Sequence, residues 1–263
     1  MTLPALLLAA WGAMALMMLL VWLVSVRIHN AGIVDVAWAA GFSILAGVAA
    51  ALGGGWPPRR ALAATMLVLW SLRLAGYLYV RVMGLHPVED GRYRQLRQEW
   101  AGRVQTRLFA FFQLQGLLDV VLALPVFIAC GNPAPRFHPL EWAGFCLWLI
   151  ALLGEATTDR QLQRFKADPA NRGRVCRAGL WRYSRHPNYF FEWLVWCAYF
   201  VFASASPWGF VTVYCPVLML FFLFRVTGIP ATEQQALRSK GDAYREYQRT
   251  TSAFVPWPPA GRP

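Results

Sequence analysis

The sequence predicts an all-α integral membrane protein of about seven transmembrane helices, and three observations lead to this fold class. Hydrophobic residues make up 57% of the 263 residues, which is too many for a soluble domain of this length. The apolar residues gather into runs of about 20, the length that a helix needs to cross a hydrocarbon core of ~30 Å. The arginines lie between these runs, and nearly all of them fall in alternate loops.

Seven apolar runs follow one another along the chain. The predicted spans are Leu3–Val26, Ala31–Leu52, Ala61–Met83, Leu108–Cys130, Leu140–Thr158, Tyr189–Ser204 and Pro207–Gly228. Glycine and proline clusters at 53–58 and 131–139 break the chain between spans. Because every loop is short and no internal repeat is visible, we expect residues 1–263 to form a single membrane domain.

The positive charge predicts the orientation in the membrane. The loops after the third and fifth spans and the tail after the seventh are rich in arginine, whereas the opposite side receives only Arg59, Arg60 and Arg136. An odd number of spans places all three rich segments, the C-terminal tail among them, on one face, which their positive charge indicates to be cytoplasmic. The net charge of +12 includes only two lysines, Lys166 and Lys240. Arginines beside spans suit a membrane face or a phosphorylated ligand, not nucleic acid.

The five cysteines form no Cys-x-x-Cys pair and show no ligand spacing with histidine. The sequence therefore predicts neither a disulfide framework nor a metal site.

Charged residues inside predicted spans are candidates for functional sites, because burying them in lipid costs several kcal/mol. Asp35, Arg73 and Asp119 lie in the second, third and fourth spans. The alternative is structural, with Asp35 or Asp119 pairing with Arg73 to hold the helices together.

Further polar residues gather where the fifth, sixth and seventh spans reach the cytoplasmic side. Glu155 and Asp159 are four residues apart, as are Asn188 and Glu192, and each pair shares a helix face. Eight basic residues lie between the two pairs, and Arg225 ends the seventh span. Guanidinium groups bind phosphates in bidentate geometry. This pattern predicts an arginine-rich cavity for a nucleotide cofactor, with a hydrophobic substrate entering from lipid.

The C-terminal 110 or so residues resemble the steroid 5-alpha-reductase superfamily, and more closely a bacterial branch of uncharacterised membrane proteins. The resemblance rests on Gly179–Tyr189 (GLWRYSRHPNY), on Glu192 and on the closing Phe254–Trp257 (FVPW). Asp35 with Trp38, and the stretch Asp90…Arg92-Tyr93, are similar to the same branch. The resemblance implies NADPH-dependent reduction of a C=C bond in a steroid-, prenyl- or fatty-acyl-like substrate. Residues 140–263 would bind the cofactor, and helices in 1–139 the substrate.

The resemblance also implies roles for single residues. Six residues match the cofactor-binding positions of the family: Asp159, Lys166, Arg174, Asn188, Glu192 and Arg225. Asp159 is expected to bind a ribose hydroxyl or amide of the cofactor, and Lys166 and Arg174 its phosphates. Asn188 and Glu192 are expected to bind the nicotinamide amide. Arg225 is expected to close the pocket. A structural alternative is open for Asn188 as a helix cap, and for the two basic loop residues as a solvated face.

The catalytic end departs from the family pattern. The reductases use a tyrosine, supported by a glutamate on a neighbouring helix, to protonate the enone oxygen. With Arg73 aligned to the arginine of the family, Trp70 falls at the place of that tyrosine. We therefore expect Tyr77, one helical turn away, to be the donor, and Asp35 to take the part of the glutamate.

Isoprenylcysteine carboxyl methyltransferase offers an alternative with a different cofactor, S-adenosylmethionine. It shares the motif Arg185-His186-Pro187, so this motif does not distinguish the two enzymes. Glu192 favours the reductase, as does Thr232 before Glu233 in place of the paired glutamates of the methyltransferase. A transporter or a membrane scaffold is a third possibility, but neither repeated halves nor helices broken within the membrane are evident.

Overall fold

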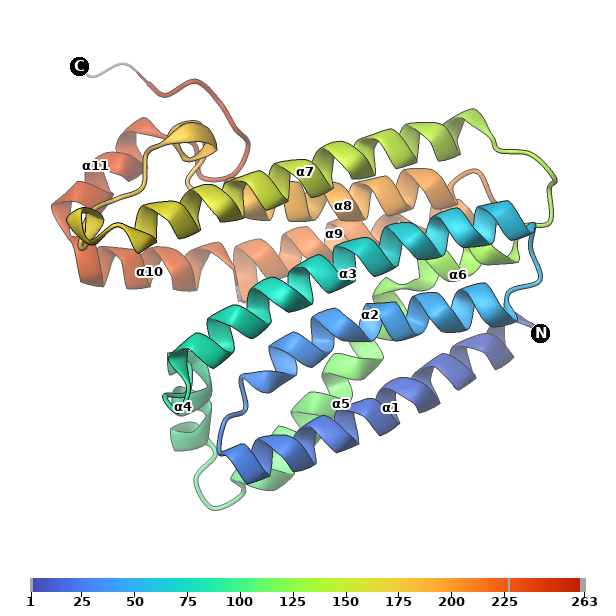
Figure 1. Cartoon of the computed structure of the whole chain (residues 1–263), viewed down its shortest axis with the longest axis horizontal. Coiled ribbons are helices and arrows are strands. Elements are labelled where there is room, and N and C mark those ends of the chain that lie inside the picture. Colours follow the sequence, from blue (N-terminus) through green and yellow to red (C-terminus); the bar gives the residue numbers. More distant parts are fainter. Residues whose placement is uncertain (1, 227, 261–263) are drawn as a thin grey trace. The chain divides into compact units, whose positions relative to one another are not determined.

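The computed structural model describes residues 2–226 and 228–260, and all its regular elements within this part of the chain are helical. The predicted all-α membrane fold is thereby confirmed. The chain divides into two compact units, and the helices of both are labelled in Figure 1. Unit 1 runs to His138 and includes Ala205–Gly209, and unit 2 comprises Pro139–Ser204 and the chain from Phe210 onward. Each unit is described by itself, and the single membrane domain stays a prediction.

Unit 1 is a bundle of long helices. Its described helices are α1 (Leu3–Ile28), α2 (Ile33–Leu52), α3 (Pro57–Leu85), α4 (Gly91–Glu99), α5 (Val104–Leu122) and α6 (Leu124–Gly131). α2 packs against α1 and α3, and α5 packs against α1. Prolines stand in the first turn of α1, α3 and α6, where the missing N–H has no intrahelical partner to lose.

The core of unit 1 lies between helices whose outer faces are apolar. On α1 the buried side chains recur every four residues, at Leu6, Ala10, Met14 and Met18. Leucines on the remaining faces of α1 are exposed, as expected for a helix surrounded by lipid. Between α2 and α3, the ring of Phe42 lies edge-on to Trp70, with centroids 5.2 Å apart.

Unit 2 contains one closely packed helix pair and a smaller helical cap. Its described α-helices are α7 (Pro139–Ala167), α8 (Pro187–Ala203), α9 (Tyr214–Phe221), α10 (Ile229–Lys240) and α11 (Asp242–Thr250). A Cβ at Gly144 of α7 would lie 2.7 Å from the backbone nitrogen of Phe202 in α8, so glycine permits this close approach. Trp148 donates from Nε1 to the hydroxyl of Tyr199 at 3.2 Å, which joins the same two helices.

Six helices of the described chain are long and apolar enough to cross a membrane. They are Leu3–Ile28, Ile33–Leu52, Pro57–Gly84, Val104–Gly131, Pro139–Ala167 and Gly209–Lys240. The sequence predicted about seven, and the difference is the predicted span Tyr189–Ser204. This segment forms α8, which has 17 residues and is therefore at the lower limit for a spanning helix.

Candidate functional site

Asp35 lies in the first turn of α2 and is held by two consecutive residues of α4. Its Oδ1 accepts hydrogen bonds from Nη2 of Arg92 at 2.7 Å and from the hydroxyl of Tyr93 at 2.6 Å. The helix α4 begins here because Asp90 caps it, its Oδ1 accepting from the backbone N–H of Arg92 at 3.0 Å. The guanidinium of Arg92 also lies 4.6 Å from the ring centroid of Tyr93.

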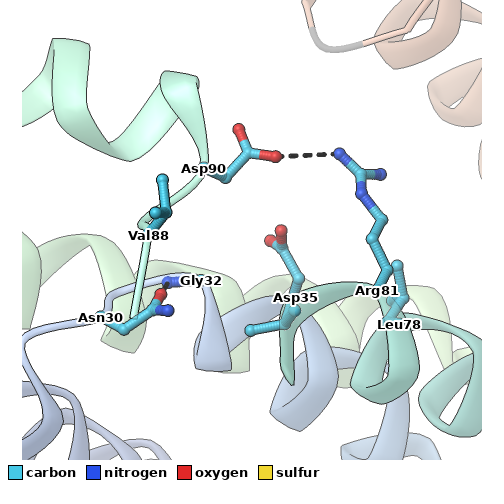
Figure 2. Close-up of a pocket in the computed structure, with 8 residues that line it drawn as sticks. Asn30, Gly32, Asp35, Leu78, Arg81, Val88 and Asp90 are labelled. Carbon is cyan, nitrogen blue, oxygen red and sulfur yellow. Dashed lines mark hydrogen bonds and ion pairs between the residues drawn. The ribbon is translucent and has the colours of Figure 1, made fainter. Parts of the chain in front are cut away.

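The Asp35 carboxylate points into a small pocket (Figure 2). The lining residues are Asn30, Gly32, Asp35, Leu78, Arg81, Val82, Val88 and Asp90. Across the pocket Nη2 of Arg81 pairs with Oδ2 of Asp90 at 2.9 Å. No described residue donates a hydrogen bond to Oδ2 of Asp35. The free volume of about 10 Å³ is room for about one water molecule and too little for a whole lipid.

Electrostatics hold these groups in defined protonation states. Burial raises the pKa of Tyr93 well above its ordinary value, and the negative charge of Asp35 raises it further, against the opposing effect of Arg92. The phenol of Tyr93 therefore remains a neutral donor. Burial would raise the pKa of Asp90, but the N–H of Arg92 and the charge of Arg81 outweigh it, so that this pKa is lowered.

A second carboxylate stabilises the position of α4. Glu89 is buried, and its Oε1 accepts from the backbone N–H of Ala31 at 2.6 Å, just before α2. Its Oε2 accepts from Nε of Arg97 in α4 at 2.7 Å. The two helices that meet at Asp35 are therefore joined at a second point.

The partners of the intramembrane acids differ from those expected. Asp35 pairs with α4, and neither oxygen of the fully buried Asp119 has a hydrogen-bond partner among the described residues. The suggested structural pairing of these acids with Arg73 is therefore wrong. Tyr77 is half-buried on α3, one turn before Arg81, and does not line the described pocket. Sequence reasoning noted the Arg92-Tyr93 stretch but assigned it no role, although its resemblance to the bacterial branch was the available signal.

In unit 2, three predicted acidic residues on α7 and α8 are buried. They are Glu155, Asp159 and Glu192. A Cβ at Gly154 of α7 would lie 2.3 Å from the ring of Phe191 in α8, so the two helices contact each other here. Glu155 and Glu192 directly follow these two residues and therefore lie at the same height along the helix pair. Glu192 also accepts from Nε1 of Trp196 at 3.1 Å.

The other predicted cofactor residues lie nearer the surface. Asn188 is half-buried in the first turn of α8, whereas Lys166, Arg174 and Arg225 have exposed side chains. Lys166 stands in the last turn of α7 and Arg174 in the loop after it, while Arg225 lies in the π-helical turn Phe222–Val226. The structure thus gives unit 2 buried acids and exposed cations, and their joint role in a cofactor site stays a prediction.

Glu233 of α10 is the centre of a polar cluster, to which the sequence analysis assigned no role. Its Oε1 accepts from Nε of Arg185 at 2.7 Å and lies 3.2 Å from Nε2 of His186, while its Oε2 accepts from Nε2 of Gln248 at 2.9 Å. Arg185 also donates from Nη1 to the carbonyl of Thr251 at 2.6 Å. The cluster joins the start of α8 to α10 and α11.

Much of the family-like motif is used for packing. Ser184 donates from Oγ to the carbonyl of Phe254 at 2.8 Å, and the hydroxyl of Tyr247 donates to the carbonyl of Trp181. The backbone N–H of Arg185 donates to the carbonyl of Ser252 at 2.8 Å. The two motif segments, about 70 residues apart, are therefore parts of one structure.

Comparison with known proteins gives matches at two levels. The family model described as "Protein of unknown function (DUF1295)" matches residues 21–251. An uncharacterized protein of Schizosaccharomyces pombe is 29% identical to this chain, and the alignment covers 73% of this chain and 62% of the yeast protein. The 3-oxo-5-alpha-steroid 4-dehydrogenase 1 of Mus musculus is 27% identical and that of Rattus norvegicus 26%, each covering 46% of this chain.

The matches cover less than two thirds of these relatives, at 43% of the mouse protein and 42% of the rat protein. No solved structure matches the chain significantly. The family model extends over most of the sequence and over both units, and the steroid dehydrogenases match independently. The chain therefore belongs to the DUF1295 family, within the steroid 5-alpha-reductase superfamily.

Proposed function

We propose that this protein is a membrane-embedded, NADPH-dependent reductase of a C=C bond in a hydrophobic substrate. The observation that carries the proposal is the Asp35 carboxylate, which points into the pocket and has one oxygen held by two donors and the other without a described donor. The similarity to 3-oxo-5-alpha-steroid 4-dehydrogenases supplies the reaction class. A steroid-, prenyl- or fatty-acyl-like substrate is consistent with the lipid-exposed helices.

Asp35 is proposed to orient a proton donor at the polar end of the substrate. Because its Oδ1 is occupied, Oδ2 is the atom left to accept a hydrogen bond from a donor in the pocket. Tyr77, which does not line the pocket in this structure, remains the proposed donor, and its side chain would have to turn toward Asp35 to protonate the carbonyl oxygen of an enone. Asp35 and Asp90 both line the pocket, so a neutral polar end is favoured over a free carboxylate.

NADPH would supply the hydride for the β-carbon of the substrate. Residues of unit 2 fit its chemistry, with buried acids at Asp159 and Glu192 and exposed cations at Lys166 and Arg174. Asn188 would share the nicotinamide amide with the glutamate. Arg225 is proposed to cover the bound nucleotide, since its side chain is exposed at the end of the α9 helix region.

The cofactor proposal is tested by titrating the purified protein in detergent and following tryptophan fluorescence. We expect saturable quenching by NADPH and weaker binding of NADH. Arg174→Ala is expected to weaken NADPH binding about 10-fold and NADH binding less, if it meets the 2′-phosphate. Arg164→Ala, at an exposed position on α7, is the matched control for lost charge. Saturable binding of S-adenosylmethionine without a response to NADPH would establish the methyltransferase in place of the reductase.

The reaction is tested by NADPH oxidation with three enone probes: progesterone, a prenyl enal and a long-chain 2-enoyl thioester. Product analysis by mass spectrometry should show a gain of two hydrogens in at least one probe. Tyr77→Phe and Asp35→Asn are each expected to lower turnover about 100-fold while NADPH binding is retained, because proton donation acts in the transition state. Normal turnover in both variants would remove these residues from the mechanism.

A cytoplasmic C-terminus is also proposed, from the arginine distribution, and a bacterial inner membrane, from the resemblance to the bacterial branch. Reporter fusions after Arg249 and after Arg136 should report opposite sides of the membrane. The same side for both fusions would contradict this topology.

A further inference from the structure

We propose that Tyr93 is a positioning residue for the reaction at Asp35. Its hydroxyl holds Oδ1 of the carboxylate and thereby keeps Oδ2 turned into the pocket. This inference rests on the proposed reductase function and deepens it, because it assigns a role to a side chain outside the pocket.

The geometry excludes direct action of Tyr93 on a substrate in the pocket. Its side chain is 0% exposed, and it is not among the residues that line the pocket. Its hydroxyl meets the pocket lining at Oδ1 of Asp35, to which it donates at 2.6 Å, while its backbone N–H donates to the carbonyl of Asp90 at 3.1 Å. Removing the hydroxyl leaves the backbone bond in place, so its effect on the reaction passes through the Asp35 carboxylate, directly or by way of Arg92, whose Nη2 donates to both the hydroxyl and Oδ1.

Arg92 contacts the same oxygen but is less suited to fix it. Its side chain is 42% exposed, so water can replace its hydrogen bond and the guanidinium can move. Tyr93 has no such freedom, because its ring is buried and α4 is held at both the Asp90 cap and the Glu89–Arg97 pair. The tyrosine thus sets the direction of the carboxylate, and the arginine contributes charge.

Without the Tyr93 hydroxyl, the Asp35 side chain has another partner to turn to. Arg81 lines the same pocket and is engaged there by Asp90 (Figure 2). We expect the freed carboxylate of Asp35 to rotate toward one of the two nearby guanidiniums. A displacement of about 1 Å in a catalytic group can cost 100-fold in rate.

The test compares Tyr93→Phe with Tyr79→Phe, which removes the same atom from a tyrosine on α3 that is 54% exposed. Progesterone and the other two enones serve as substrates for the full-length protein. We expect Tyr93→Phe to lower kcat by about 10- to 100-fold, with KM and the Kd for NADPH changed less than about two-fold. Tyr79→Phe should match the wild type. The melting temperature of each variant is recorded in the same detergent.

The double variant Asp35→Asn/Tyr93→Phe separates positioning from a general structural role. If Tyr93 acts through Asp35, the double variant is no slower than Asp35→Asn alone. Multiplying losses would show two independent effects and overturn the inference, as would a Tyr93→Phe variant with wild-type kcat. A Tyr93→Phe variant that fails to fold or to bind NADPH would assign the tyrosine to stability and also overturn it. Failure of the proposed function is decided separately, by a wild-type protein that reduces none of the probes.

Discussion

The carboxylates of Asp35 in unit 1 and Glu233 in unit 2 are bound in the same way at one oxygen and differently at the other. In each case an arginine and the aromatic residue that follows it converge on a single oxygen. Arg92 and Tyr93 meet Oδ1 of Asp35, and Arg185 and His186 meet Oε1 of Glu233. An Arg-aromatic dipeptide thus serves both sites.

The two sites differ in the hydrogen bonding of the second carboxylate oxygen. Oε2 of Glu233 accepts from Gln248, so both oxygens of this glutamate have protein partners. Asp35 lines a pocket, and its Oδ2 accepts from no described residue. The side chain of Glu233 is 16% exposed, and that of Asp35 is 32% exposed. A saturated carboxylate joins helices, whereas one with an open oxygen remains available to a ligand.

The largest expected effect is on stability at the saturated site. Glu233→Ala should lower the free energy of unfolding by about 3–5 kcal/mol, because it leaves the largely buried Arg185 and His186 without their partner. Asp35→Ala should cost about 1–2 kcal/mol, because the buried hydroxyl of Tyr93 loses its acceptor, whereas Arg92 is already partly hydrated. Thermal unfolding in detergent compares the two variants. Equal losses would contradict the distinction between an anchoring and an available carboxylate.

Asp119 extends the comparison of the carboxylates, because neither of its oxygens is hydrogen-bonded to a described residue. It is fully buried on α5, and a Cβ at Gly41 of α2 would lie 3.1 Å from its Oδ2. Asp119→Val should raise stability by about 1–2 kcal/mol, because it removes an unsatisfied buried polar group. Asp119→Asn, which keeps a polar group there, is the control and should stay close to the wild type. Destabilisation by valine would reveal a partner for this carboxyl, such as a bound water or ligand.

The smallest expected effect concerns the cap of the helix that presents Tyr93. Asp90→Ala should cost about 1 kcal/mol near neutral pH, because the cap of α4 is lost. Since the pKa of Asp90 is lowered in the folded protein, its contribution is complete above the unfolded pKa of about 4 and is lost as the pH falls through the folded value. The difference in melting temperature between the variant and the wild type should therefore shrink in acid. A constant difference from pH 7 to pH 3 would show that the charge of Asp90 plays no part.

The sequence by itself determined the helical membrane character and most of the spans. A run of apolar residues needs no distant partner to become a transmembrane helix, because lipid requires every backbone group to be bonded within the segment. The breaks were equally local, since prolines and glycines act on their own backbone at 53–58 and 131–139. The family motifs identified the superfamily. The assigned roles of the cofactor residues, the bacterial branch and the relation to the methyltransferase stay predictions.

Only the tertiary structure decided which charged groups meet. Asp35 is hydrogen-bonded to Tyr93, 58 residues away in the sequence, and Arg185 is hydrogen-bonded to Glu233, 48 residues away. From hydropathy, Asp35 and Arg73 are predicted to lie on consecutive transmembrane helices, which makes an ion pair between them reasonable. The partners of Asp35 come instead from the polar helix α4. Hydropathy measures transfer into lipid, one segment at a time. A hydrogen bond instead depends on the rotation and position of two packed helices, to within a fraction of an ångström.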